Sequence, residues 1–205
     1  MNTRIVLAFF NDDETAAALA KLRAKAAEVI AVVFDLGGGG SLNELRLAAL
    51  AAGAARCHSL DVSEEFLRSA VLPALKAFSS ATTPPPLGEI ATRFVNDQLQ
   101  AVARIEQATV IERREPISTG GSKRPALIAG PALLEIDFSD GVPVAVNEIP
   151  MALGELMESV ETIAGVQAAE VIRLAYRELG QSGDGQVAIR TGSGQCELVA
   201  VAAAV

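Results

Sequence analysis

The chain is poor in the residues that most often carry metal and redox chemistry. Its 205 residues include no tryptophan, one tyrosine, one histidine and two cysteines. Because His58 is the only histidine, neither a histidine-based metal cluster nor a histidine relay can form, and we expect this side chain to be structural. Cys57 and Cys196 form no Cys-x-x-Cys pair and are typical of reduced, buried thiols in a cytoplasmic protein. We therefore name no catalytic residue and no metal ligand.

Positive charge and long apolar runs are also scarce. Lysine and arginine number 17 against 25 aspartates and glutamates, for a formal net charge of −8. A basic stripe of the kind that binds nucleic acid is absent, and the negative charge disfavours anionic membranes and polyanionic ligands. No apolar run reaches the roughly 18–20 residues that span a bilayer. These features predict a cytoplasmic protein with neither a nucleic acid nor a membrane as its partner.

The first half of the chain alternates predicted strands with predicted helices. Half of all residues are apolar, so a sizeable core can form. Residues 4–10 and 28–35 are apolar runs rich in β-branched and aromatic residues, which is typical of buried strands. Shorter strands are predicted at 55–60 and 108–111, with helices up to about residue 25 and at 41–52, 63–78 and 87–106. This alternation predicts parallel βαβ units in an α/β domain over residues 1–111.

The second half has a different pattern. Residues 112–130 lose all periodicity, and we interpret them as a linker or mobile loop. Asp140-Gly141 lies between two alternating segments, which is a strong hairpin signal. Strands are predicted at 132–138, 142–146, 186–191 and 195–201, and helices at 153–163 and 168–179. Residues 131–205 are therefore predicted to form a small α+β domain.

Several motifs in both halves share their order and spacing with one enzyme family. They comprise the strand–turn–helix at residues 5–15, the Asp-Leu-Gly turn at 35–37, Leu87-Gly88 with Arg93, and segments at 135–147 and 185–190. With these motifs the chain resembles argininosuccinate synthase, without the middle of the second domain and the C-terminal oligomerisation helix. The resemblance implies a doubly wound parallel sheet of the adenine nucleotide α-hydrolase type, followed by the small α+β domain. It also implies the family's reaction, in which ATP adenylates citrulline, pyrophosphate leaves and aspartate is joined.

The pyrophosphate loop of the family is altered at nearly every position. After a strand that ends in alanine and an aromatic, the family has S-G-G-x-D-T, where this chain has F-N-D-D-E-T from Phe10 to Thr15. Glycines are needed because phosphate approaches the backbone closely at a helix N-terminus. Here up to three carboxylates lie where a triphosphate would bind. By resemblance, the vestigial ATP site comprises Ala8, Phe10, Asn11, Asp12, Glu14, Thr15 and Phe34.

The same loop residues suit a helix that caps itself. Asn11 is a good N-cap, and Glu14 three residues later would complete a capping box. Asp12 and Asp13 would complement the helix dipole. We favour this interpretation, with phosphate binding as the alternative. Phe34 occupies the position of a small alanine that lies against adenine in the family, so its ring would fill the base pocket or, alternatively, stack with a base.

The citrulline site implied by the resemblance is also altered. Pro85, Glu89 and Ile90 replace the family's tyrosine, threonine and serine, whereas Arg93 is retained. A surface arginine on a helix is the simpler interpretation of Arg93. By resemblance, Glu89, Ile90 and Arg93 are the vestigial substrate-binding residues.

These substitutions predict an argininosuccinate synthase-like protein that is catalytically inactive and has no cofactor. It would act by protein–protein contact, including contact with a full-length synthase, or bind a metabolite in a remodelled cleft. The alternative is an active ATP-dependent ligase with an altered phosphate site, which would use ATP and Mg²⁺. The uncharged tail at 199–205 and the apolar hairpins predict a homo-oligomer, with a dimer through the C-terminal domain as the simplest form. A monomer whose tail folds back as an internal strand is the other possibility.

Overall fold

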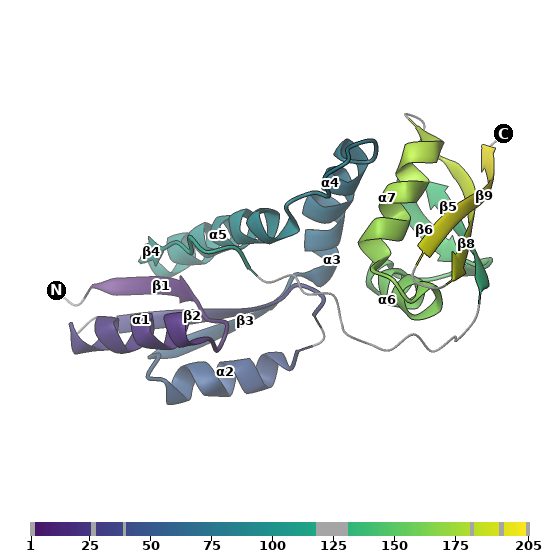
Figure 1. Ribbon diagram of the computed structural model, residues 1–205. Coiled ribbons are helices and arrows are strands. Elements are labelled where there is room, and N and C mark those ends of the chain that lie inside the picture. The colour runs from purple at the N-terminus through teal and green to yellow at the C-terminus, as the bar shows by residue number, and fades with distance from the viewer. Residues whose placement is uncertain are drawn as a thin grey trace. The chain divides into compact units, whose positions relative to one another are not determined.

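The computed structural model describes residues 3–25, 28–38, 40–117, 131–180, 183–192 and 195–203 (Figure 1). Residue contacts divide the chain into two units, described separately below. Unit 1 comprises Met1–Phe66 with Pro86–Thr119, and unit 2 comprises Leu67–Pro85 with Gly120–Val205. The division into residues 1–111, 112–130 and 131–205 stays a prediction, because residues 118–130 lie outside the described part of the chain.

Unit 1 is built on a four-stranded parallel sheet. Its strands are β1 (Arg4–Ala8), β2 (Glu28–Asp35), β3 (Arg56–Asp61) and β4 (Thr109–Ile111). Their order is β3-β2-β1-β4, so the chain moves outward from β1 to β3 and then returns to the other side of β1. The predicted doubly wound parallel sheet is confirmed. The first strand is shorter than predicted, since it ends at Ala8 and residues 9 and 10 already belong to the connection that follows.

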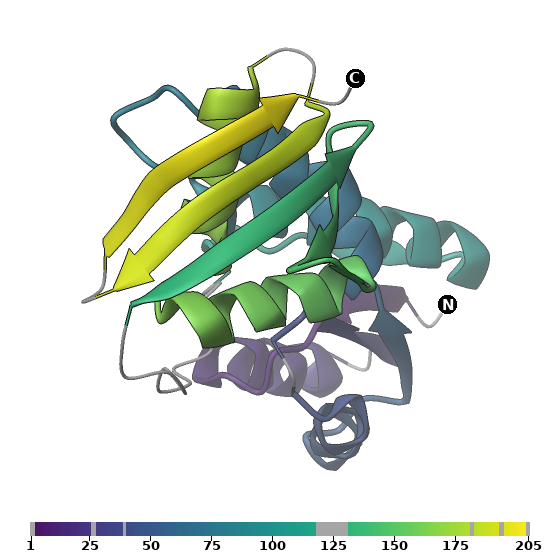
Figure 2. The same ribbon diagram turned by 90° about the vertical axis from the view of Figure 1, so that its right-hand side faces the viewer.

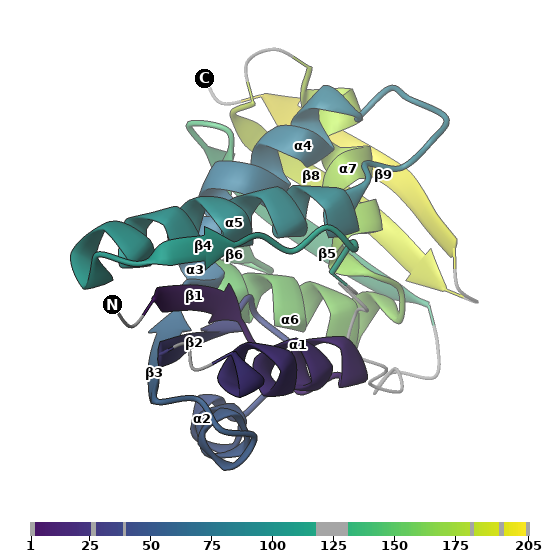
Figure 3. The same ribbon diagram turned by 90° about the vertical axis from the view of Figure 1, so that its left-hand side faces the viewer.

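Helices cover both faces of this sheet (Figure 3). The helices α1 (Asp13–Ala24) and α2 (Leu42–Ala51) pack on one face, where Leu19 and Ala49 meet alternate residues of β1 and β2. The helix α5 (Leu87–Glu106) contacts β1 and β4 and buries Val95 and Leu99. Side chains of β1 and β2 are therefore buried on both faces, which explains why these strands are continuous apolar runs.

The segment 112–117 follows β4, has no regular secondary structure and is hydrogen-bonded to α5. The side chain of Asn96 accepts a hydrogen bond from the backbone N–H of Arg113 at 3.0 Å and donates one to its carbonyl oxygen at 2.9 Å. The Thr92 hydroxyl oxygen accepts from the N–H of Ile117 at 3.0 Å, and the Ile117 side chain is buried. These residues were predicted to begin a linker or mobile loop, but the described part of that segment is hydrogen-bonded to α5.

Unit 2 contains a five-stranded antiparallel sheet in the order β7-β6-β5-β8-β9 (Figure 2). The elements of this unit after residue 130 are β5 (Ala132–Ser139), β6 (Val142–Val146), β7 (Ile149–Pro150), α6 (Leu153–Ala164), α7 (Ala168–Leu179), β8 (Gly185–Gly192) and β9 (Gln195–Ala203). The two helices pack on one face of the sheet. Asp140 and Gly141, both with positive φ, join β5 to β6. The predicted α+β arrangement is confirmed, and β9 is an edge strand.

The helix predicted over residues 63–78 contains a π-helical turn. The structure has α3 (Ser63–Phe66), a π-helical turn (Leu67–Val71) and α4 (Leu72–Ala77). Pro73 follows this turn and accounts for the departure from regular α-helical hydrogen bonding, because it lacks the N–H that an α-helix would direct to the carbonyl four residues earlier, and its ring crowds that carbonyl. The chain is thus helical from Ser63 to Ala77, close to the predicted bounds, and only the π-helical turn was not predicted.

Candidate functional site

The carboxyl ends of β1 and β4 form the topological switch point of unit 1. These two strands are adjacent, but the chain forms β2 and β3 on the other side of β1 before it reaches β4. In doubly wound sheets, ligands bind in the crevice outside the strand ends at such a switch point. The loop from Phe9 to Asp12 leaves β1 at this place and leads into α1. The site is therefore built from this loop, the start of α1 and the residues that follow β4.

Asp12, rather than Asn11, caps α1. Asp12 has an extended backbone, and its Oδ1 atom accepts hydrogen bonds from the Thr15 N–H at 2.8 Å and the Thr15 hydroxyl at 2.7 Å. Asn11 has φ +57°, a left-handed conformation that asparagine tolerates better than most residues. The predicted capping box of Asn11 and Glu14 was therefore wrong by one residue. The general prediction that α1 caps itself with its own side chain is confirmed.

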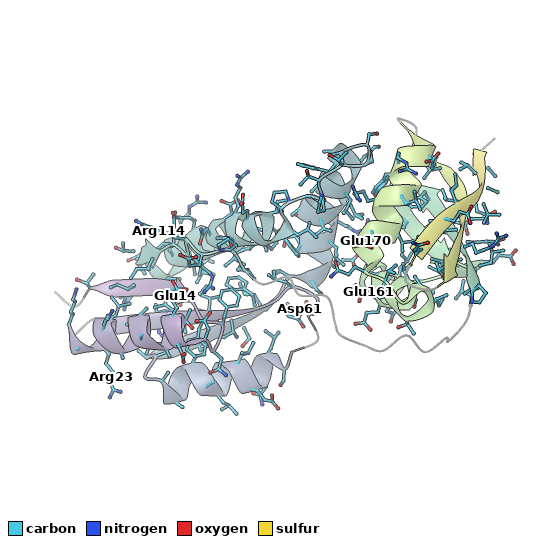
Figure 4. All side chains as sticks on the ribbon, in the orientation of Figure 1. Glu14, Arg23, Asp61, Arg114, Glu161 and Glu170 are labelled. Carbon is cyan, nitrogen blue, oxygen red and sulfur yellow. The ribbon has the colours of Figure 1, made fainter. Side chains whose placement is uncertain are left out.

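The guanidinium of Arg113 lies against this capped helix start. Its Nη1 atom is 3.1 Å from Asp12 Oδ2 and 3.6 Å from Glu14 Oε2, and the side chain is only 13% exposed. Its Cζ atom is 5.0 Å from the centre of the Phe10 ring. Figure 4 labels Glu14 on α1 and Arg114, the neighbour of Arg113, in the segment after β4. Sequence reasoning missed Arg113, because no local pattern marks a contact between residues 101 positions apart.

Two phenylalanines complete the cluster. The rings of Phe10 and Phe34 are stacked with centroids 6.5 Å apart, and Phe34 is buried at the end of β2. Ala8 is buried at the end of β1. The structure therefore brings together the residues predicted for the vestigial ATP site and adds one cation to them. We call Phe10, Asp12, Glu14, Phe34 and Arg113 the strand-end cluster.

Comparison with known proteins identifies the family of this unit. The family model for the arginosuccinate synthase N-terminal HUP domain matches residues 4–115. The chain belongs to the argininosuccinate synthase family. It is 37% identical over 109 residues to argininosuccinate synthase of Streptococcus suis, a match that covers 53% of this chain and 27% of the relative. For the synthase of Carboxydothermus hydrogenoformans, identity is 34% over 113 residues, covering 54% and 28%. The chain thus matches only about a quarter of the length of these relatives.

The comparison with solved structures adds little to the family assignment. The chain is similar to a universal stress protein solved in complex with cAMP, with a TM-score of 0.24 and 19% identity. This likeness covers 54% of the chain and 94% of the other protein. Its TM-score is too low to support an argument about the fold or the site.

The residues predicted for the citrulline site of the argininosuccinate synthase family lie at the start of α5. Glu89 and Arg93 line an open groove of about 510 Å³, which is also lined by Thr92, Asn96, Asp97, Glu112, Arg114 and Pro116. Ile90 is half-buried and is not among the lining residues. None of the strand-end cluster lines this groove. The two groups of residues named by the family resemblance therefore do not share one pocket.

A separate charged network lies at the amino ends of the strands. His58 Nε2 is 2.8 Å from Glu106 Oε1, and Arg56 bridges Glu106 and Glu28. The hydrogen bond with His58 lowers the pKa of Glu106, which burial opposes. These contacts support the structural role predicted for His58. In the described ranges, no group of three or more histidine, cysteine, aspartate or glutamate side chains could hold a metal ion.

The two cysteines are only half-buried, whereas the sequence predicted buried thiols. Burial raises the pKa of both Cys57 and Cys196. In the part of the chain that the structure describes, no helix has the length and apolar character needed to cross a membrane.

The ionised form of Asp12 is stabilised by its partners. Burial raises its pKa, but hydrogen bonds from Thr15 and the charge of Arg113 outweigh burial and hold the pKa below its ordinary value of 3.8. A carboxyl group with a lowered pKa in the folded state contributes stability above its unfolded pKa. That contribution is lost as the pH falls through the folded value.

We therefore expect Asp12→Asn to weaken the acid dependence of stability. Asparagine can still accept the Thr15 N–H, but it has no charge to lose between about pH 5 and pH 2. Urea unfolding at a series of pH values would measure the difference, with Asp13→Asn, at the same helix start, as the matched control. If the free energy of unfolding fell equally with acid in wild type and in Asp12→Asn, the stabilising role of the ionised Asp12 side chain would be contradicted.

Proposed function

We propose that this member of the argininosuccinate synthase family does not bind and activate ATP. It acts instead by protein–protein contact or by binding a metabolite in the remodelled unit. The observation that carries this proposal is the strand-end cluster, in which Arg113 pairs with Asp12 and Glu14 beside the Phe10 ring.

The hydrogen bonding of the loop supports the proposal. A phosphate at a helix N-terminus is bound by backbone N–H groups that have no other partner. Here the Thr15 N–H already donates to the side chain of Asp12. An approaching phosphate would therefore compete with a covalently attached carboxylate. It would also meet the negative charges of Asp12 and Glu14, at a cost of about 1 kcal/mol for each close pair in a water-like dielectric.

The aromatic residues support the same conclusion. Phe34 is 5% exposed and stacks on Phe10. By the family resemblance, the base would lie against the residue at position 34, and a small side chain would leave room for it. The buried ring of Phe34 takes up space at that position. Both the phosphate and the base positions of the nucleotide are thus altered.

An active ATP-dependent ligase that joins citrulline and aspartate is the second candidate. One observation favours it: Arg113 places a guanidinium at the switch point, and guanidinium groups bind phosphate well. For catalysis, Arg113 would have to exchange Asp12 and Glu14 for the phosphates of ATP. The groove at Glu89 and Arg93 would then belong to a substrate site.

ATP with Mg²⁺ is expected to leave the melting temperature of the protein unchanged. A ligand at 100 times its dissociation constant stabilises a protein by about 2.7 kcal/mol, which a thermal melt detects readily. The titration would extend to millimolar ATP and include pyrophosphate, with a full-length synthase as the positive control.

A clear rise in melting temperature with ATP would overturn the proposed function. Release of pyrophosphate in the presence of ATP, citrulline and aspartate would establish the ligase instead. Self-association through unit 2 stays a prediction, and it is independent of the outcome with ATP.

A further inference from the structure

The groups around the Arg113 side chain match a guanidinium in charge and in shape. Asp12 and Glu14 offer carboxylate oxygens to Nη1, at 3.1 and 3.6 Å. The Glu115 carbonyl oxygen accepts a hydrogen bond from Nε at 3.1 Å. The Phe10 ring lies against the guanidinium carbon, 5.0 Å from its centre. Carboxylate oxygens and an aromatic face are partners that a planar, delocalised cation prefers.

Most of these partners are held in place without help from Arg113. Asp12 uses Oδ1 for the two hydrogen bonds from Thr15, and this leaves Oδ2 for the cation. The ring of Phe10 is supported by the buried ring of Phe34. Glu14 extends from the first turn of α1. Asp12, Glu14 and Phe10 thus belong to a capped helix and two stacked rings, whereas the guanidinium and the Glu115 carbonyl oxygen come from the segment 112–117.

Arg113 is brought to this place by the segment 112–117. Its backbone is fixed by Asn96, and the buried Ile117 anchors the segment four residues later. Its neighbour Arg114 is exposed and lines the groove beside α5 instead. Only one of two adjacent arginines therefore lies in the strand-end cluster. The position of Arg113 in the chain, and not its charge alone, places its guanidinium there.

We propose that the strand-end cluster is a guanidinium-binding site, with the Arg113 side chain as its resident ligand. An external ligand that carries a guanidinium group would take the same place when Arg113 is absent or displaced. The proposal rests on the proposed function in one respect, namely that this crevice does not hold a nucleotide. The switch point has thus changed from a site suited to phosphate anions into a site for an organic cation.

The attachment of Arg113 to the chain makes the wild-type site self-occupied. A tethered ligand competes at a high effective concentration, on the order of millimolar for short flexible tethers. A free guanidinium ligand must exceed that concentration to displace it. Binding in the wild-type protein is therefore expected to be weak, and it should become measurable once the Arg113 side chain is removed.

The test is titration of Arg113→Ala with methylguanidinium by calorimetry. Arg114→Ala is the matched control, since it removes an adjacent arginine that lies outside the cluster. Methylurea has the same planar shape without the charge, and methylammonium has the charge without the planar fork. We expect methylguanidinium to bind Arg113→Ala at least about tenfold more tightly than either probe, and at least about tenfold more tightly than it binds Arg114→Ala. Equal binding of the three probes, or no binding to Arg113→Ala, would overturn the proposal.

A measurement on the wild-type protein covers the case in which Arg113→Ala does not fold. Ring currents from Phe10 should move the side-chain proton resonances of Arg113 upfield in the NMR spectrum, and those of Arg114 should stay near their random-coil positions. Phe10→Leu should remove the shift. Identical chemical shifts for the two arginines would contradict the placement of Arg113 in the strand-end cluster.

The two proposals can fail separately. ATP binding to the wild-type protein would end the proposed function, but it would leave the methylguanidinium result with Arg113→Ala to be decided on its own. Conversely, failure of methylguanidinium to bind would leave the absence of ATP binding untouched.

Discussion

Replacing Arg113 by alanine is expected to lower the free energy of unfolding by about 2 kcal/mol. The ion pairs with Asp12 and Glu14 contribute little each, because these carboxylate side chains are 38% and 55% exposed. Stacking on Phe10 and the hydrogen bond to the Glu115 carbonyl add to them. The Asp12 carboxylate would also remain without its cation. Urea-induced unfolding at neutral pH would measure the loss.

Arg114→Ala is the control for this prediction. Arg114 is exposed, and we expect its removal to change the free energy of unfolding by less than about 0.5 kcal/mol. A double-mutant cycle between Arg113→Ala and Phe10→Leu would isolate the contribution of the ring, which we expect to be about 0.5–1 kcal/mol. Equal effects of Arg113→Ala and Arg114→Ala would show that the cluster adds nothing to stability.

Replacing Tyr176 by alanine is expected to have a larger effect, a loss of about 3–5 kcal/mol in unit 2. Tyr176 lies on α7, is 2% exposed and packs edge-on against Phe138 at a centroid distance of 5.5 Å. Its hydroxyl donates a hydrogen bond of 2.6 Å to the carbonyl oxygen of Gly141, in the turn between β5 and β6. One side chain thus joins the helix to the sheet and to its first hairpin. Burial raises the pKa of Tyr176 to about 12, so its hydroxyl remains a donor at physiological pH.

Tyr176→Phe separates the ring from the hydroxyl. It keeps the packing and removes only the hydrogen bond to Gly141, so we expect a loss of about 1 kcal/mol. Circular dichroism during urea unfolding would compare both variants with wild type. If phenylalanine were as destabilising as alanine, the hydrogen bond would outweigh the packing, contrary to the prediction.

Much of unit 1 could be predicted because its strongest signals are local. The strands β1 and β2 are buried on both faces, and such strands appear as continuous apolar runs. The hairpin at Asp140-Gly141 was predicted for a similar reason, since two positive φ angles in succession favour this dipeptide. The π-helical turn before Pro73 was not predicted, because the apolar spacing around it continues through the turn.

The candidate site was predictable only in part. Phe10, Asp12 and Glu14 could be placed at the start of a helix, because a capping pattern follows a strand. The choice of cap could not be made correctly, because Asn11 and Asp12 are both good caps and the decision depends on the backbone of the loop. Family resemblance named both Phe10 and Phe34 as site residues, whereas the stacking of their rings was found only in the structure.

The sequence by itself determined the parallel α/β character of unit 1, the family to which the chain belongs and the loss of the glycines from its phosphate loop. These properties follow from residue types and from their order and spacing along the chain. Only the tertiary structure decided that Arg113 occupies the switch point. The reason is physical: the contact joins residues 101 positions apart, and it exists because β4 returns to pair with β1 after two intervening strands. In the segment that follows β4, Arg113 lies at the start of α1 and Arg114 lies at the groove.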